Sequence, residues 1–122
     1  MIIGSFCLNA AHEDMLRSVV RALDHEMTAF SSMHDIGATG VGLIFAEWNS
    51  QTETDIVTEL LRVSDERATR IPIILIIPRG WNRILELASD LGAYDVLLAP
   101  PNPAEIKAEI ERVTTDPWLV AR

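Results

Sequence analysis

The sequence predicts an α/β domain in which a five-stranded parallel sheet lies between helices on both faces. Short apolar runs of strand length alternate with longer stretches whose apolar residues recur at helical spacing. Strands that alternate with helices favour a parallel sheet with right-handed crossovers. The most hydrophobic run, 71–77, is aliphatic apart from Pro72, which suits a central strand covered on both faces. At 122 residues the chain has the length of one domain.

The first part of the chain predicts two strand–helix units of unequal size. Residues 2–8 form an apolar run of strand length, and residues 12–23 carry apolar side chains at helical spacing. Residues 24–32 alternate weakly and are expected to form the second strand. Residues 33–40 contain two glycines and leave room for one helical turn at most, so we expect the second helix to be short or missing.

The third unit begins with a continuous apolar strand at 41–45, and Asn49 or Ser50 is placed to cap the helix that follows. Apolar residues predict the face of this helix that lies on the sheet: Ile56, Val57, Leu60, Leu61 and Val63.

The last two units follow from residue 71 onward. Residues 71–77 form the fourth strand, and residues 79–91 predict a helix with Trp81, Ile84, Leu85, Ala88 and Leu91 facing inward. Gly92 stands where a glycine commonly ends a helix. Residues 95–98 form the fifth strand. Pro103 opens the last helix, which buries Ile106, Ile110 and Val113. We therefore expect a domain over 1–113 and a tail or linker over 114–122.

Charge and composition restrict the possible partners and the compartment. Lys and Arg number 10 against 18 Asp and Glu, and a net charge of −8 disfavours direct contact with nucleic acid or an anionic membrane. The N-terminus has no basic region typical of a secretory signal. The single cysteine, Cys7, has no partner for a disulfide and is expected to be buried in the first strand. These features predict a cytoplasmic protein.

Ligands of parallel α/β sheets bind at the carboxyl ends of the strands. Candidate functional residues are therefore those that directly follow a strand: Asn9, Glu47, Trp48, Asn49, Ile77, Pro78, Ala99, Pro100 and Pro101. Glu47 draws attention because an apolar strand ends on its carboxylate.

Three segments carry a resemblance to a known family: GLIFAEWN at 42–49, IPIILIIP at 71–78 and LGAYDVLLAPPNPAEI at 91–106. Together with the five strand–helix units, they resemble the receiver (CheY-like) domain of bacterial response regulators, over nearly the whole chain. The resemblance implies a flavodoxin-like three-layer fold. It also implies transfer of a phosphoryl group to an aspartate after the third strand, assisted by Mg²⁺, a lysine and a hydroxyl.

The chain departs from the family pattern at each of these positions. The acceptor position falls on Glu47, and the expected acidic pair falls near Asn9, where no carboxylate is found. Ala99 stands in place of the lysine and Ile77 in place of the hydroxyl, while the switch aromatic is replaced by Val96, with Tyr94 as a displaced substitute. These departures predict a pseudo-receiver with no catalytic residues and no cofactor or metal. Glu47 then either mimics a constant negative charge or caps the following helix.

Other site chemistry finds little support in the sequence. His12, Glu13 and Asp14 are assigned to the start of the first helix, where acids favour the helix dipole. His12, His25 and His34 show no metal-binding spacing, and no phosphate-binding glycine pattern follows the first strand. Trp48 and Trp81 follow neighbouring strands and, if exposed, suit a protein interface, although Trp81 also suits packing at a helix start.

Three functions remain open. The first is a regulatory module of phosphorelay signalling that works through a protein partner, with a possible homodimer through the helix at 79–91, the strand at 95–98 and the helix from Pro103. That face would carry mixed charges: Arg83, Glu86, Asp90, Lys107, Glu109 and Arg112. The second is the N-terminal wing domain of a pyridoxal-phosphate-dependent basic amino-acid decarboxylase, since these wing domains are also receiver-like. The third is the N-terminal domain of a larger transcriptional regulator.

Overall fold

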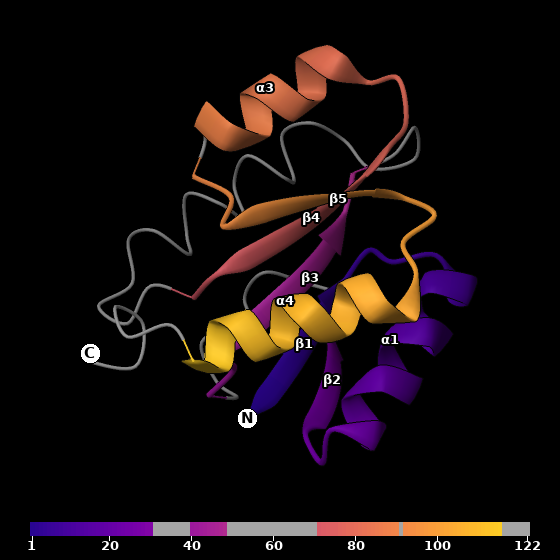
Figure 1. Ribbon diagram of the computed structural model, residues 1–122, viewed down its shortest axis with the longest axis vertical. Coiled ribbons are helices and arrows are strands. Elements are labelled where there is room, and N and C mark those ends of the chain that lie inside the picture. The colour runs from indigo at the N-terminus through magenta and orange to yellow at the C-terminus, as the bar shows by residue number, and fades with distance from the viewer. Residues whose placement is uncertain (31–39, 49–70, 91, 116–122) are drawn as a thin grey trace.

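The computed structural model describes residues 1–30, 40–48, 71–90 and 92–115 (Figure 1). Five parallel strands form one sheet in the order β2-β1-β3-β4-β5. The predicted flavodoxin-like sheet is confirmed. The strands are β1 (Ile2–Phe6), β2 (Glu26–Phe30), β3 (Leu43–Glu47), β4 (Ile73–Pro78) and β5 (Asp95–Ala99). The described helices are α1 (Ala10–Ala22), α3 (Asn82–Asp90) and α4 (Pro103–Thr115).

Most element boundaries lie within two residues of those expected from the sequence. α4 ends at Thr115, so it continues past the predicted domain end at Val113. The short second helix expected within 33–40 and the helix expected after Asn49 fall outside the described residues, as does the tail from residue 116. No helix in the described ranges has the length and apolar content needed to cross a membrane.

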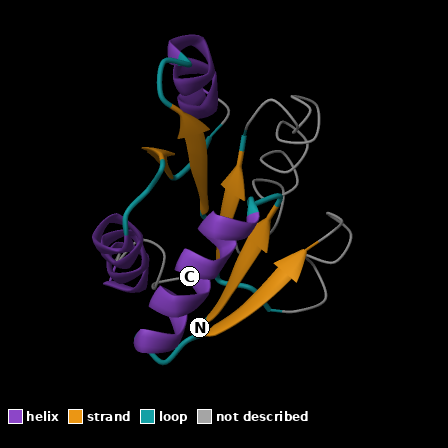
Figure 2. Ribbon diagram, turned by 90° about the vertical axis from the view of Figure 1, so that its right-hand side faces the viewer, coloured by secondary structure: helices purple, strands orange, loops and turns teal. Residues whose placement is uncertain are grey.

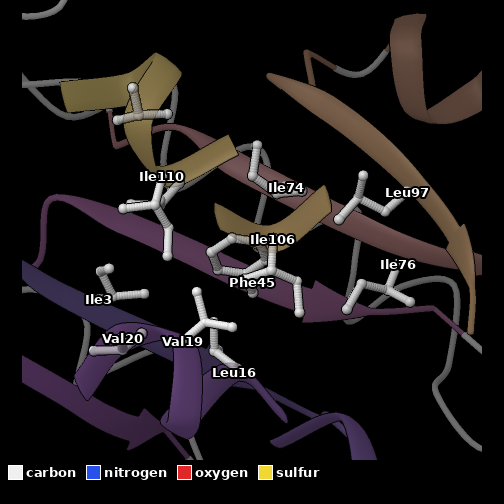
Figure 3. Close-up of a cluster of buried hydrophobic side chains, with 12 residues drawn as sticks. Ile3, Leu16, Val19, Val20, Phe45, Ile74, Ile76, Leu97, Ile106 and Ile110 are labelled. Carbon is white, nitrogen blue, oxygen red and sulfur yellow. The ribbon is translucent and has the colours of Figure 1, made fainter. Parts of the chain in front are cut away.

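The side chains of the strands alternate between two core layers, as the pleat of a β-strand requires. On β3, Leu43 and Phe45 face the layer under α1 and α4, whereas Ile44 and Ala46 face the layer under α3. α1 and α4 lie on the same side of the sheet (Figure 2). In the layer under α1 and α4, aliphatic side chains of both helices pack against those of the sheet (Figure 3). The predicted buried stripe of α4, Ile106, Ile110 and Val113, is confirmed.

The end of α3 confirms the helix-ending role predicted for Gly92. Its φ is +96°, and the next amide, Ala93 N–H, donates to the carbonyl of Ala88 at 3.1 Å. This is the hydrogen bond that closes a helix ending on a left-handed residue. The inward face of α3 is narrower than predicted. Leu85 is 38% exposed, whereas Ala88 is fully buried in the layer under α3.

One further sequence prediction, the burial of Cys7, was wrong, and the packed alternative for Trp81 is the one that the structure shows. Cys7 is exposed, because β1 ends at Phe6 and Cys7 already turns the chain with φ of +59°. Trp48 is only 1% exposed, since the alternation along β3 continues one residue past the strand and directs its ring into the layer under α3. Trp81 is half-buried against the same layer. Trp48 is therefore a core residue, and no exposed tryptophan pair is formed.

Candidate functional site

The candidate site lies at the carboxyl end of β3, where Glu47 is the last residue of the strand. Its side chain belongs to the same face as Phe45, the face that α1 covers. β1 is paired with β3, with Phe6 opposite Ala46, so the loop after β1 passes beside Glu47. The order of the strands reverses between β1 and β3, which is the position where parallel α/β sheets bind ligands.

Glu47 and His12 form a buried pair at this position. The Nδ1 atom of His12 lies 2.6 Å from Oε1 of Glu47, and the two residues are 8% and 4% exposed. A contact of this length is a hydrogen bond, with one proton between the nitrogen and the oxygen. Burial of a carboxylate is costly unless it is hydrogen-bonded, and His12 supplies such a partner. α1 thus brings a basic group to the place where the family pattern has acids.

Asn9 holds the pair in place through both its backbone and its side chain. Its Oδ1 accepts the backbone N–H of His12 at 2.8 Å, which caps the start of α1. Its backbone N–H donates to Oε1 of Glu47 at 3.2 Å, and its Nδ2 donates to Oε2 at 3.4 Å. One residue therefore fixes both the N-terminus of α1 and the carboxylate of β3.

The other acids at the start of α1 are not directed at Glu47. The carboxylate of Glu13 accepts the hydroxyl of Ser5 at 3.1 Å, and Asp14 is exposed. Mg²⁺ prefers several carboxylate and water oxygens in an octahedral arrangement. Across the described ranges, no three His, Cys, Asp or Glu side chains gather in a way that suits a metal ion. An imidazole and an amide beside one carboxylate do not fit the Mg²⁺ site that the resemblance implies.

Cys7 lies in the same loop and responds to the same charge. Partial burial of the sulfur, and then the negative charge of Glu47, raise the pKa of the Cys7 thiol. Because the thiolate is the reactive form, this environment disfavours nucleophilic chemistry at Cys7.

The remaining predicted positions are aliphatic or lie elsewhere. Ile77 is fully buried in the layer under α3, so its side chain is on the opposite face from Glu47. By alternation, Pro78 is the residue at the end of β4 that shares the face of Glu47. Ala99 is half-buried on that face and carries no charge, and Val96 is half-buried against the layer under α3. Asn49 lies outside the described residues.

Tyr94 belongs to a second group of polar residues, away from Glu47. The guanidinium of Arg112 lies 5.1 Å from the centre of its ring. Arg112 also contacts Asp95 of β5 and Glu109 of α4. Glu109 is only 7% exposed, so its assignment to an exposed charged face was wrong. The face of α4 that carries Glu109 rests against β5, and Arg112 compensates the charge there.

Sequence reasoning missed His12 as a site residue. Its spacing of three residues from Asn9 was a usable signal, because the residue at that distance from a helix cap lies in the first turn beside the cap. Nothing local to the sequence states that this turn meets the end of β3, which is 35 residues away. That information comes from the pairing of β1 with β3.

Comparisons with known proteins support the fold. No family model matches the chain, and no curated protein matches it either. Among solved structures, NtrX from Brucella abortus aligns with a TM-score of 0.82 at 18% identity, over 98% of this chain and 28% of that chain. The separate receiver domain of the same NtrX gives a TM-score of 0.80 at 19% identity, over 93% of this chain and 98% of that one.

The chemotaxis response regulator CheY4 of Vibrio cholerae gives a TM-score of 0.75 at 13% identity, over 92% of this chain and 97% of that one. The present chain thus spans 28% of the full NtrX chain but nearly all of the isolated receiver domains. With its strand order, parallel pairing and helix placement, the chain has the fold of response regulator receiver domains.

Proposed function

We propose that this chain is a receiver-type regulatory module that acts through protein contacts, without phosphorylation at Glu47. The observation that carries the proposal is the buried Glu47–His12 pair at the end of β3. Both carboxylate oxygens of Glu47 accept hydrogen bonds from the β1–α1 segment. An attacking carboxylate needs an open in-line approach to the phosphoryl donor, and this one is 4% exposed.

The surrounding residues support the same reading. Phosphoryl transfer depends mainly on positive charge placed where negative charge develops. Ala99 brings no cation to the end of β5, and Pro78 brings no hydroxyl to the end of β4. Glutamate also extends its carboxylate about 1.5 Å further than aspartate would. The imidazole of His12 is directed at Glu47 itself, so it stabilises the resting carboxyl group rather than a transition state.

The pair supports one of the two roles of Glu47 that the sequence left open. A constant-charge mimic requires a net negative charge at the end of β3. Glu47 instead is buried, and both of its carboxylate oxygens accept hydrogen bonds from the segment that joins β1 to α1. We therefore favour a structural role, in which Glu47 ties α1 to the central strand.

The test is the intact mass of the protein after incubation with acetyl phosphate and Mg²⁺. We expect no phosphoryl adduct on the natural protein, because Glu47 is buried and paired. A Glu47→Asp variant is treated in parallel, and we expect no adduct on it either, since Asn9 and His12 remain in place of the acidic pair.

A stable adduct on Glu47 of the natural protein would contradict the proposal. An adduct on the aspartate variant alone would mean that the pocket supports transfer and that Glu47 blocks it. That second outcome would restore the constant-charge role. Peptide mapping of any adduct separates modification at position 47 from modification at the exposed side chains of α1.

The similarity to NtrX supports a further part of the proposal, that this module serves within a longer regulator. The alignment covers 98% of the present chain but only 28% of the NtrX chain. In such an arrangement the fold supplies a contact surface for a partner domain or kinase.

The surface formed by α3, β5 and α4 is our proposed site of self-association. Leu85 of α3 is 38% exposed there. A hollow of about 350 Å³ is lined by Leu85, Ala93, Tyr94, Asp95 and Val96. Exposed apolar side chains beside charged ones are typical of protein interfaces.

Sedimentation velocity over a concentration series tests this association. We expect a dimer that weakens as salt rises, and a Leu85→Asp variant that remains monomeric because it places a charge in the apolar contact. Ala10→Asp introduces the same charge on the exposed side of α1 and should leave association unchanged. A natural protein that stays monomeric at high concentration would rule this homodimer out.

A further inference from the structure

Three charged side chains meet where α4 rests on β5. One nitrogen of the Arg112 guanidinium lies 2.5 Å from Oδ2 of Asp95 and 2.6 Å from Oε2 of Glu109. The same nitrogen thus contacts two carboxyl groups, one from each element. Glu109 is 7% exposed, whereas Asp95 and Arg112 are partly open to solvent.

The two carboxyl groups are held close together, because both contact the same nitrogen of Arg112. Two carboxylates at such a position repel one another, so a proton on one of them relieves the repulsion. The other oxygen of Asp95 accepts the backbone N–H of Val96 at 2.8 Å. Hydrogen bonds from an amide and a guanidinium stabilise the ionised form of Asp95, so Asp95 is the carboxyl group that stays ionised more easily.

The buried partner is therefore the one that holds the proton. Burial, followed by the hydrogen bond and the negative charge of Asp95, raises the pKa of Glu109 to about 7 against the opposing effect of Arg112. Burial alone would raise the pKa of Asp95, but its hydrogen bonds with Glu109, Val96 and Arg112 lower it.

We propose that Asp95 and Glu109 form a proton-binding carboxyl pair that makes the contact between β5 and α4 sensitive to pH. When the proton leaves, two carboxylates share one guanidinium, and their repulsion weakens the contact between strand and helix. The charge of the surface formed by α3, β5 and α4 becomes more negative by one unit. This inference does not depend on the receiver function proposed above.

The other charged groups near the pair are few within the described ranges. Tyr94 lies beneath Arg112. Glu105, one turn before Glu109, accepts the backbone N–H of Asn102 at 3.1 Å and so belongs to the cap of α4. Lys107 points about 200° around the helix from Glu109 and contacts Glu111 at 3.9 Å. α1 meets α4 on the side of Ala104 and Lys107, away from the pair.

Stability should fall as this proton is lost. Folded Glu109 keeps its proton up to about pH 7, whereas an unfolded chain releases it near the ordinary glutamate value of about 4.3. The native state therefore binds more protons between these values, and the free energy of unfolding decreases as the pH rises through them. Asp95 is ionised in both states over this range, so it adds no opposing slope.

The test is a titration of the folded protein followed by the carboxyl carbon of Glu109 in NMR. We expect a midpoint near pH 7 in the natural protein. Asp95→Asn removes the neighbouring charge and should move the midpoint down by at least one pH unit. Glu111→Gln, an exposed change on the same helix, should leave it in place. A midpoint below pH 5 in the natural protein would overturn the proposal.

A second measurement uses urea unfolding at pH 5.5 and pH 8.5. The natural protein should show a lower urea midpoint at the higher pH, and Glu109→Gln should lose most of that difference because it removes the titrating group. If the variant keeps the full difference, Glu109 is not the group responsible. The NMR titration needs no variant, so it decides the question even if Glu109→Gln folds poorly.

Discussion

Replacing Trp48 with alanine is expected to lower the free energy of unfolding by about 3–5 kcal/mol. Trp48 is 1% exposed and is among the largest fully buried side chains in the described part of the protein. It lies in the layer under α3, together with Ile44 and Ala46 of the same strand. Its removal leaves a cavity at the end of β3 that the sheet cannot close, because neighbouring strands hold the backbone there. Urea denaturation followed by circular dichroism measures the loss.

Leu87→Ala is the matched control, because Leu87 is 37% exposed on α3. A surface change of this kind should cost less than about 0.5–1 kcal/mol. If Trp48→Ala lowered the free energy of unfolding as little as the control does, Trp48 would be a surface residue. An interface that includes the tryptophans would then be the better interpretation. Trp48→Phe should recover part of the loss, since an aromatic ring would still fill much of the site.

Replacing His12 with leucine is expected to destabilise the protein by about 3 kcal/mol at neutral pH, because it removes the imidazole that lies 2.6 Å from the buried Glu47 carboxylate. Glu47 retains the hydrogen bonds from Asn9, which limit the loss. Chemical denaturation of the variant against the natural protein measures the change. Asp14→Leu, an exposed substitution two residues further along α1, should stay within about 0.5 kcal/mol.

A double-mutant cycle separates the pair from its surroundings. Glu47→Leu combined with His12→Leu removes both polar groups, and buried ion pairs replaced by apolar residues are often nearly neutral in stability. We expect the double variant to be more stable than the sum of the two single changes predicts, by about 1–3 kcal/mol. Additive losses would mean that His12 and Glu47 do not stabilise each other, which would remove the main support for the structural role of Glu47.

The sequence alone determined the fold class and most of the elements. Continuous aliphatic runs marked the buried strands, and helical spacing marked the buried face of α4 at Ile106, Ile110 and Val113. Gly92 was recognisable as a helix end, because the conformation it adopts favours glycine. These signals are local, because each is contained in fewer than about fifteen consecutive residues. They can therefore be recognised without knowledge of the neighbouring elements.

The candidate site was only partly predictable. The sequence placed Asn9 and Glu47 at strand ends, because all parallel strands end at the same edge of the sheet. It did not show that His12 pairs with Glu47, or that Ile77 faces away from it. Both facts depend on which residue of β3 lies opposite which residue of its neighbours, and a shift of one residue would exchange the two faces.

Burial of individual residues was likewise decided by tertiary structure. Cys7 looked like a strand residue, but β1 ends one residue earlier and exposes it. Glu109 looked like a surface charge, but α4 turns it toward Asp95, which lies 14 residues earlier in the sequence. The sequence by itself determined which elements form. The packing of α1 and α4 on the sheet decided which polar groups meet, because hydrogen bonds and charge pairs depend on distances of about 3 Å that only the register of the strands and the rotation of the helices set.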